Sequence, residues 1–143
     1  MITNLKEYFS DSYNLFLDEI NYKKLNNPQN GVMLELKCND QIEAKMDDAR
    51  NVSVWVRRTL KFDTDEVFFL KVSFGAILAL NEKKKDEYDW TKIDLAREFK
   101  ENGGFVTNNL MSRISLLIAQ ITASVGQQPL ILPPNISGGE IEE

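Results

Sequence analysis

The chain has 143 residues, of which 43% are hydrophobic and 27% charged, and this composition indicates one globular domain and excludes a disordered polypeptide. Its net charge of -5 argues against a nucleic-acid-binding protein, because phosphate binding needs concentrated Lys and Arg. The lack of histidine excludes a Ser-His-Asp or Cys-His site, and the single cysteine, Cys38, excludes an intrachain disulfide and a multi-cysteine zinc site. We therefore expect no catalytic residue, no metal and no cofactor.

Acidic residues cluster in three places without forming a recognisable metal site. Residues 47–48, 63–66 and 140–143 lack the Asp-x-Asp-x-Asp-Gly order and the distant Glu that calcium loops need. The sequence also lacks the Gly-x-x-x-x-Gly-Lys-Ser/Thr and Gly-x-Gly-x-x-Gly motifs of nucleotide sites. We interpret the acidic residues as turn and solubility positions.

The hydropathy pattern does not indicate a membrane protein. Asn4, Lys6, Glu7 and Asp11 interrupt the charged-then-apolar order of a signal peptide. The most apolar segment, 114–125, is shorter than a membrane span and contains Ser, Gln and Thr. We expect a cytoplasmic protein without membrane insertion.

Two strands are predicted after an N-terminal segment, 1–12, that contains one short amphipathic helical turn. The first strand covers 13–25, and its alternation places these residues on the buried face: Tyr13, Leu15 and Leu17. Turn residues at 26–31 end it. The second strand begins at 32, and its buried face carries Val32, Leu34, Leu36 and Cys38. Cys38 is thus expected to be a small buried thiol.

Two further strands follow, and turns at 47–51 and 63–65 separate them. The third strand covers 52–60, with a buried face of Val52, Val54, Val56 and Leu60. The fourth covers 67–80, with a buried face of Phe68, Leu70, Val72, Phe74, Ala76 and Leu78. Gly75 within it predicts a bulge or bend. Because short turns join the strands, residues 13–80 are predicted to form an antiparallel meander.

Helices are predicted in the region 89–125. Asp89 or Thr91 caps a first helix that runs to Glu101 and stops at 102–104. The second runs from Thr107 to Val125 and ends at Gly126, and its apolar arc faces the sheet with Leu110, Met111, Ile114, Leu117, Ile118, Ile121 and Val125. The fold class is therefore α+β: a four-stranded antiparallel sheet (meander) followed by helices packed on one face.

The other side of the long helix bears small residues that would let another backbone approach closely. This candidate oligomer interface consists of Ser112, Ser115, Ala119, Thr122 and Ala123. An ordinary exposed face of small residues is the alternative interpretation.

Several apolar residues interrupt the expected alternation and fall on the wet face of the sheet: Phe16, Met33, Trp55 and Phe69. A solvent-facing cluster of this kind is typical of an interaction surface. The alternative is that the phase slips at a bulge, so that some of them are core. A second apolar stretch, Leu130-Ile131-Leu132, lies between Pro129 and Pro133 and is suited to wall a groove for an extended polypeptide.

Three segments together resemble the SecB family of protein-export chaperones. The turn Leu25-Asn26-Asn27-Pro28 is similar to the end of the family's first strand, and residues 68–77 resemble its Phe-Leu-Cys-Glu-Val-Gln-Gln-Gly-Gly-Ile segment. Residues 128–135, after a helix that keeps Arg113, resemble the family's Pro-x-Leu-x-Leu-x-Pro-Val-Asn run. The resemblance implies a single SecB-like domain over 1–143 with a flexible acidic tail at 137–143.

What the resemblance implies is an ATP-independent holdase that binds unfolded polypeptides or preproteins and serves protein export. It also implies a homotetramer built as a dimer of dimers, with a SecA-like motor or an antitoxin as further partner. The positions aligned with the family's acidic SecA contacts carry Tyr22, Asn26 and Lys71. The alternative is a chaperone dedicated to one partner or to an antitoxin. The candidate client-binding residues are Phe16, Trp55, Phe69, Leu130, Ile131 and Leu132.

Overall fold

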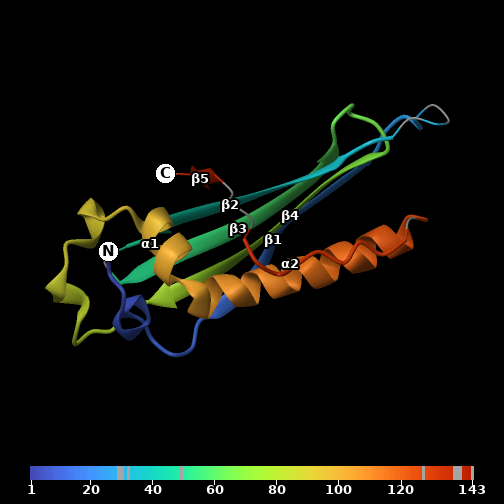
Figure 1. The fold of residues 1–143 in the computed structure, drawn as a ribbon. Helices are drawn as coiled ribbons and strands as arrows, with labels where there is room; N and C mark the ends of the chain where they lie inside the picture. The colour runs from blue at the N-terminus through green and yellow to red at the C-terminus, as the bar shows by residue number, and fades with distance from the viewer. Residues whose placement is uncertain (29–30, 32, 49, 127, 137–139, 143) are drawn as a thin grey trace.

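A computed structural model describes residues 1–28, 31, 33–48, 50–126, 128–136 and 140–142. Four long strands are present: β1 (Asn14–Lys24), β2 (Leu36–Met46), β3 (Asn51–Phe62) and β4 (Phe68–Ala79). They lie in the order β1-β4-β3-β2 with antiparallel neighbours, and a short β5 (Glu140–Glu142) joins the outer edge of β2 in parallel (Figure 1). The expected four-stranded antiparallel sheet is confirmed.

The predicted meander order is wrong for the first strand. β2, β3 and β4 follow one another through short turns, but β1 pairs with β4 and not with β2. β1 ends at Lys24 on one side of the four long strands, and β2 begins at Leu36 on the other side. Leu25, directly after β1, stays bonded beside the start of β4, since its N–H donates to Val67 O (3.1 Å). An alternating pattern identifies a strand and its faces, but it does not identify the neighbouring strand.

The second strand begins later than predicted. β2 starts at Leu36, Met33 is 95% exposed, and Val32 lies outside the described residues. The prediction of a buried Cys38 is also wrong, because Cys38 is exposed near the start of β2. Its Sγ lies 3.8 Å from Asp40 Oδ1.

Outside the strands, the described residues form two α-helices and three short 3-10 turns. The turns are η1 (Leu5–Tyr8), η2 (Lys85–Glu87) and η3 (Trp90–Lys92), and the helices are α1 (Leu95–Asn102) and α2 (Gly104–Ser124). The single helix expected from Asp89 or Thr91 is therefore split: Asp89 caps η3 and Asp94 caps α1. The predicted stop near Gly103 and the end of the long helix before Gly126, at φ +87°, are confirmed.

Both α-helices cover the same face of the sheet (Figure 1). Even-numbered residues of β3 and β4 fill the core beneath them, where Val54, Val56 and Leu70 are fully buried. Leu110, Met111, Ile114 and Ile118 of α2 are buried as predicted, whereas Leu117 and Ile121 are half-buried and Val125 is 39% exposed. Val125 was therefore wrongly placed in the core; it caps the end of α2, where the helix diverges from the strands.

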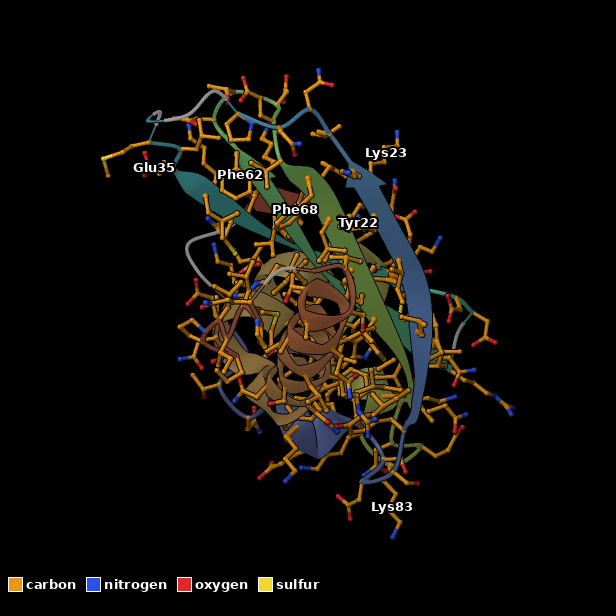
Figure 2. All side chains as sticks on the ribbon, turned by 90° about the vertical axis from the view of Figure 1, so that its right-hand side faces the viewer. Tyr22, Lys23, Glu35, Phe62, Phe68 and Lys83 are labelled. Atoms are coloured by element: carbon orange, nitrogen blue, oxygen red, sulfur yellow. The ribbon has the colours of Figure 1, made fainter. Side chains whose placement is uncertain are left out.

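Aromatic rings close the end of the sheet from which α2 diverges (Figure 2). Phe68 is 1% exposed, and its ring centroid lies 6.0 Å from that of Tyr22 and 5.4 Å from that of Phe62. Such ring pairs add to the stability that area burial provides. This end of the core therefore depends on strand side chains for its cover.

The bulge in the sheet lies in β1 and not at Gly75. The register of β1 on β4 shifts between Leu17 and Glu19, so the two halves of β1 present different parities to the core. Leu17 precedes the shift and lies on the side of β1 that faces the helices, but it is 50% exposed because no helix covers this part of β1. Its predicted burial is therefore wrong. Gly75 instead makes room for Phe16, since a Cβ atom there would lie 2.3 Å from the Phe16 ring.

Candidate functional site

The predicted client-binding residues fall on opposite faces of the sheet, so they do not form one site. Phe16, Trp55 and Phe69 belong to the helix-free face, opposite in parity to the core residues of β3 and β4. Residues 130–132 belong to the C-terminal segment on the helix side (Figure 1). We call residues 128–136 the C-terminal strip.

Phe16 and Trp55 lie in one row across the helix-free face. Both pair with Gly75 of β4, from opposite sides, and both are half-buried. The amino group of Lys45 lies 5.3 Å from the centroid of the Trp55 ring, within the range of a cation–π contact. The β1 bulge comes after Phe16 and leaves Phe16 on this face, so the phase slip does not turn it into a core residue.

Phe69 lies far from this row. Its partners are Lys23 and Lys61, and three two-residue steps along β4 separate it from Gly75, or about 20 Å. Ion pairs occupy the intervening surface, with Arg57 to Glu43 at 2.9 Å and Lys71 to Glu19 at 3.1 Å. The helix-free face therefore carries separate aromatic sites and no continuous apolar patch.

One polar atom in this surface is buried. Ser73 lies between these ion pairs in the sheet, opposite Arg57 and Glu19, and it is fully buried. Its Oγ has no hydrogen-bond partner among the described residues. We have no physical account of this serine.

The C-terminal strip lies along α2 in an extended form. Leu130 and Leu132 are half-buried against the core, and Ile131 between them is 85% exposed. The backbone N–H of Leu130 donates to Thr122 Oγ1 at 2.9 Å, which fixes the strip to the helix. The three residues thus alternate between the core and the solvent, as in a strand.

Arg58 of β3 binds the second half of the strip, residues 133–135, through its guanidinium group. Its Nη1 donates to the carbonyl oxygen of Pro133 and its Nη2 to that of Asn135, both at 2.9 Å. Its Nε and Nη2 also donate to the two carboxylate oxygens of Asp40 at 2.7 and 2.8 Å. A weaker contact of 3.5 Å joins Nη1 to Ser115 Oγ. One guanidinium thus connects β3, β2, α2 and the strip.

The Arg58–Asp40 pair is buried, with Arg58 2% and Asp40 0% exposed. Burial lowers the pKa of Arg58, but the hydrogen bonds and the charge of Asp40 more than offset this effect and hold the pKa above the usual arginine value. Arg58 therefore stays charged, and its satisfied hydrogen bonds specify where the strip lies.

The sequence interpretation missed this pair. Arg58 and Asp40 occupy core-facing positions of two neighbouring strands, between Val56 and Leu60 and before Ile42. An acidic and a basic residue at core-facing positions of two neighbouring predicted strands would have indicated a buried ion pair.

The structure divides the predicted oligomer interface. Thr122 is fully buried, and its hydroxyl donates to the carbonyl oxygen of Ile118 (2.8 Å), so it is not available to another subunit. Ser115 is half-buried beside Arg58. Ser112 and Ala123 remain exposed and Ala119 half-exposed, next to Leu116, which is 62% exposed.

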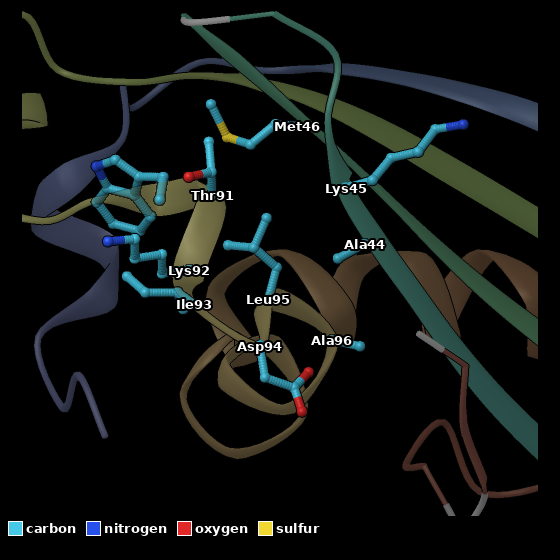
Figure 3. A pocket seen from close by; sticks show the side chains of 10 residues that line it. Ala44, Lys45, Met46, Thr91, Lys92, Ile93, Asp94, Leu95 and Ala96 are labelled. Atoms are coloured by element: carbon cyan, nitrogen blue, oxygen red, sulfur yellow. The ribbon is translucent and has the colours of Figure 1, made fainter.

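A pocket of about 550 Å³ opens beside the last residues of β2 (Figure 3). It lies between β2 and the segment 90–96, and it is lined by Ala44, Lys45, Met46, Trp90, Thr91, Lys92, Ile93, Asp94, Leu95 and Ala96. Within the described part of the chain, no cluster of three or more metal-ligating side chains is present. No helix of the described residues is long and apolar enough to cross a membrane.

No family model and no curated protein sequence matches the chain. Among solved structures, it is similar to the Mycobacterium tuberculosis SecB-like chaperone Rv1957, in complex with a ChAD peptide from the Rv1956 HigA1 antitoxin. The TM-score is 0.68 at 16% identity, over 90% of this chain and 92% of that chain. A protein of unknown function from Streptococcus agalactiae matches with a TM-score of 0.41 at 12% identity, over 84% and 93% of the two chains. The first match shows that the chain has a SecB-like α+β fold, as the resemblance implied.

Proposed function

We propose that this protein is an ATP-independent holdase that binds unfolded polypeptides or preproteins in an extended form. The observation that carries the proposal is the C-terminal strip, whose backbone is fixed to Thr122 and Arg58 while Ile131 is 85% exposed. Apolar burial yields about 25 cal/mol per Å² and has no directional requirement, so such a surface binds many sequences. The absence of a nucleotide motif from the sequence fits an ATP-independent mechanism.

In this proposal Leu130, Ile131 and Leu132 form the main client contact. Ile131 touches the client directly, and its two half-buried neighbours set the position of the backbone. Two secondary contacts lie on the helix-free face: one is formed by Phe16 and Trp55, and the other by Phe69. A client segment that reaches both contacts has to cross the ion pairs between them.

The proposal includes assembly in the cytoplasm as a homotetramer, a dimer of dimers. It is supported by apolar side chains on the β1 side, where Leu17 is 50% and Ile20 44% exposed, and by Leu116, 62% exposed, beside Ala119 and Ala123 on α2. None of the described strands pairs with the outer edge of β1. These surfaces fit contacts between copies of the chain.

Aggregation of a chemically unfolded client, followed by light scattering without ATP, tests the function. We expect the protein to suppress aggregation at a stoichiometric ratio and Ile131→Asp to weaken suppression, because a carboxylate replaces the exposed apolar contact. Ile131→Leu is the matched control and should retain suppression. Failure of the unaltered protein to suppress aggregation of any unfolded client would reject the holdase.

A second candidate is a chaperone dedicated to a single partner such as an antitoxin. It is favoured by the fold shared with Rv1957, which was solved with an antitoxin peptide. A SecA-dependent export role has less support, because Lys71, where the family has an acidic SecA contact, is a cation paired with Glu19. Affinity capture from a lysate separates the candidates: many unrelated unfolded chains support the holdase, and one recurrent partner supports the dedicated chaperone.

A further inference from the structure

The outer edge of β2 carries a strand that differs from the rest of the sheet. β5 pairs with β2 in parallel, with Glu140 opposite Gln41, Ile141 opposite Ile42 and Glu142 opposite Glu43. Residues 140–142 of the acidic tail 137–143 form this strand, and residues 137–139 and 143 lie outside the described residues. The Glu-Ile-Glu alternation places its one β-branched apolar residue in register with Ile42, which is 1% exposed.

β5 covers only the middle of that edge. Among the described residues, no strand pairs with the outer edge of Ala44, Lys45 or Met46. The pocket of about 550 Å³ opens beside these same residues (Figure 3). Because β5 runs parallel to β2, a strand that follows its path is directed toward Ala44 and Met46, and so into the pocket.

The register defines what such a strand must carry. Positions opposite Ile42, Ala44 and Met46 share the helix side of the sheet with the pocket, which also has Ile93, Leu95 and Ala96 in its lining. These positions fit apolar side chains. The position opposite Lys45 shares the helix-free face with its ammonium group and fits a carboxylate. β5 has the same alternation of polar and apolar residues over its three residues, opposite Gln41, Ile42 and Glu43.

We propose that the outer edge of β2, from Gln41 to Met46, is a strand-addition site for an extended client segment that runs parallel to β2, alternates apolar with polar residues and places a carboxylate opposite Lys45. Residues 140–142 occupy half of this site and compete with the client. Main-chain hydrogen bonds provide the affinity, and the pocket and Lys45 provide the preference for side chains. This proposal rests on the proposed polypeptide-binding function and adds the direction and chemistry of the bound segment.

Truncation after residue 139 tests the competition. The probe is a fluorescent synthetic peptide of residues 135–143, with a scrambled peptide of the same composition as control. If the tail leaves the edge open in about one molecule in five, removing it raises the apparent affinity for the probe about fivefold. Ile141→Lys should act like the truncation and Ile141→Val like the unaltered chain. Equal affinity of the probe for the full and truncated chains, or binding of the scrambled peptide, overturns the proposal.

A charge exchange tests the predicted side-chain preference. The probe is extended by one residue, so that its last residue lies opposite Lys45, and this residue is either Glu or Lys. The unaltered truncated chain should prefer the Glu peptide and Lys45→Glu the Lys peptide. The same preference in both chains overturns the assigned register.

Two readouts distinguish failure of the site from failure of the function. Hydrogen exchange at 41–43 should become faster on truncation and slow again when the probe binds. Unchanged exchange together with intact suppression of aggregation rejects the strand-addition site and leaves the holdase standing. Loss of suppression in the unaltered chain rejects the holdase, and slower exchange with the probe would then still support a peptide site.

Discussion

The two edges of the sheet are completed in different ways. On the β2 side, the C-terminal strip and β5 cover the core and the strand edge, and a buried guanidinium holds the strip in place. On the β1 side, none of the described strands pairs with the outer edge, and Leu17 and Ile20 remain partly exposed. The exposed main-chain groups of a strand edge are satisfied by β5 at the middle of β2, whereas no described strand satisfies those of β1.

The largest expected effect comes from the buried pair on the β2 side. Arg58→Ala leaves the carboxylate of Asp40 buried without its partner, and we expect a loss of about 3–5 kcal/mol in the free energy of unfolding, measured by urea denaturation. Arg57→Ala removes the more exposed ion pair between Arg57 and Glu43, and it should lower the free energy of unfolding by about 1 kcal/mol or less. Similar losses in the two variants would contradict the role assigned to Arg58.

On the β1 side, the strongest expected effect is at Gly75. A Cβ atom there would lie 2.3 Å from the Phe16 ring, so Gly75→Ala forces the ring to move and should cost about 1–3 kcal/mol of unfolding free energy. The double variant with Phe16→Ala should remove most of this additional cost. If the two effects simply add, Phe16 does not lie over Gly75.

The fixation of the strip to α2 should have a smaller effect. Thr122→Val removes the oxygen that accepts from the Leu130 N–H and should cost about 1 kcal/mol, with faster hydrogen exchange at Leu130. Thr122→Ser keeps the hydroxyl and should leave the exchange rate unchanged. Slow exchange at Leu130 in the valine variant would show that the strip is fixed elsewhere.

The smallest effect on unfolding is expected at the uncovered apolar residues of β1. Leu17→Asp and Ile20→Asp should change the free energy of unfolding of the separated subunit by about 0.5 kcal/mol or less, because both side chains are partly exposed. The mass in solution, measured by light scattering, should fall if these residues form a subunit contact. Ile77→Asp is the control, since Ile77 is 38% exposed on the helix-free face. An unchanged mass in the two β1 variants would remove β1 from the interface.

Local patterns were sufficient to predict most elements of this fold. The alternation in 52–60 and 67–80 identified β3 and β4 and their buried faces, because side-chain direction in a strand repeats every two residues. The turn chemistry at 102–104 and Gly126 identified where the helices end. These features depend on residues close together in the chain.

Features that depend on distant residues were not predictable in this way. The pairing of β1 with β4, the position of β5 and the contacts of Arg58 with Pro133 and Asn135 all join segments far apart in sequence. Within the candidate site, residues 130–132 were proposed from the sequence, but the support of the C-terminal strip by Arg58 and Asp40 was not predicted. The exposure of Leu17 and Val125 was missed because periodicity assigns a face without showing whether anything covers that face.

Any segment that takes the place of the C-terminal strip must provide hydrogen-bond acceptors for the N–H groups of Arg58. If residues 133–135 leave, two donors of a buried cation lose their carbonyl acceptors, and a newcomer must bring two carbonyl oxygens at the same spacing. Every residue type carries that group in its main chain, whereas few side chains offer it. The contacts of Arg58 with the strip therefore depend on an extended main chain and do not depend on the side chains attached to it.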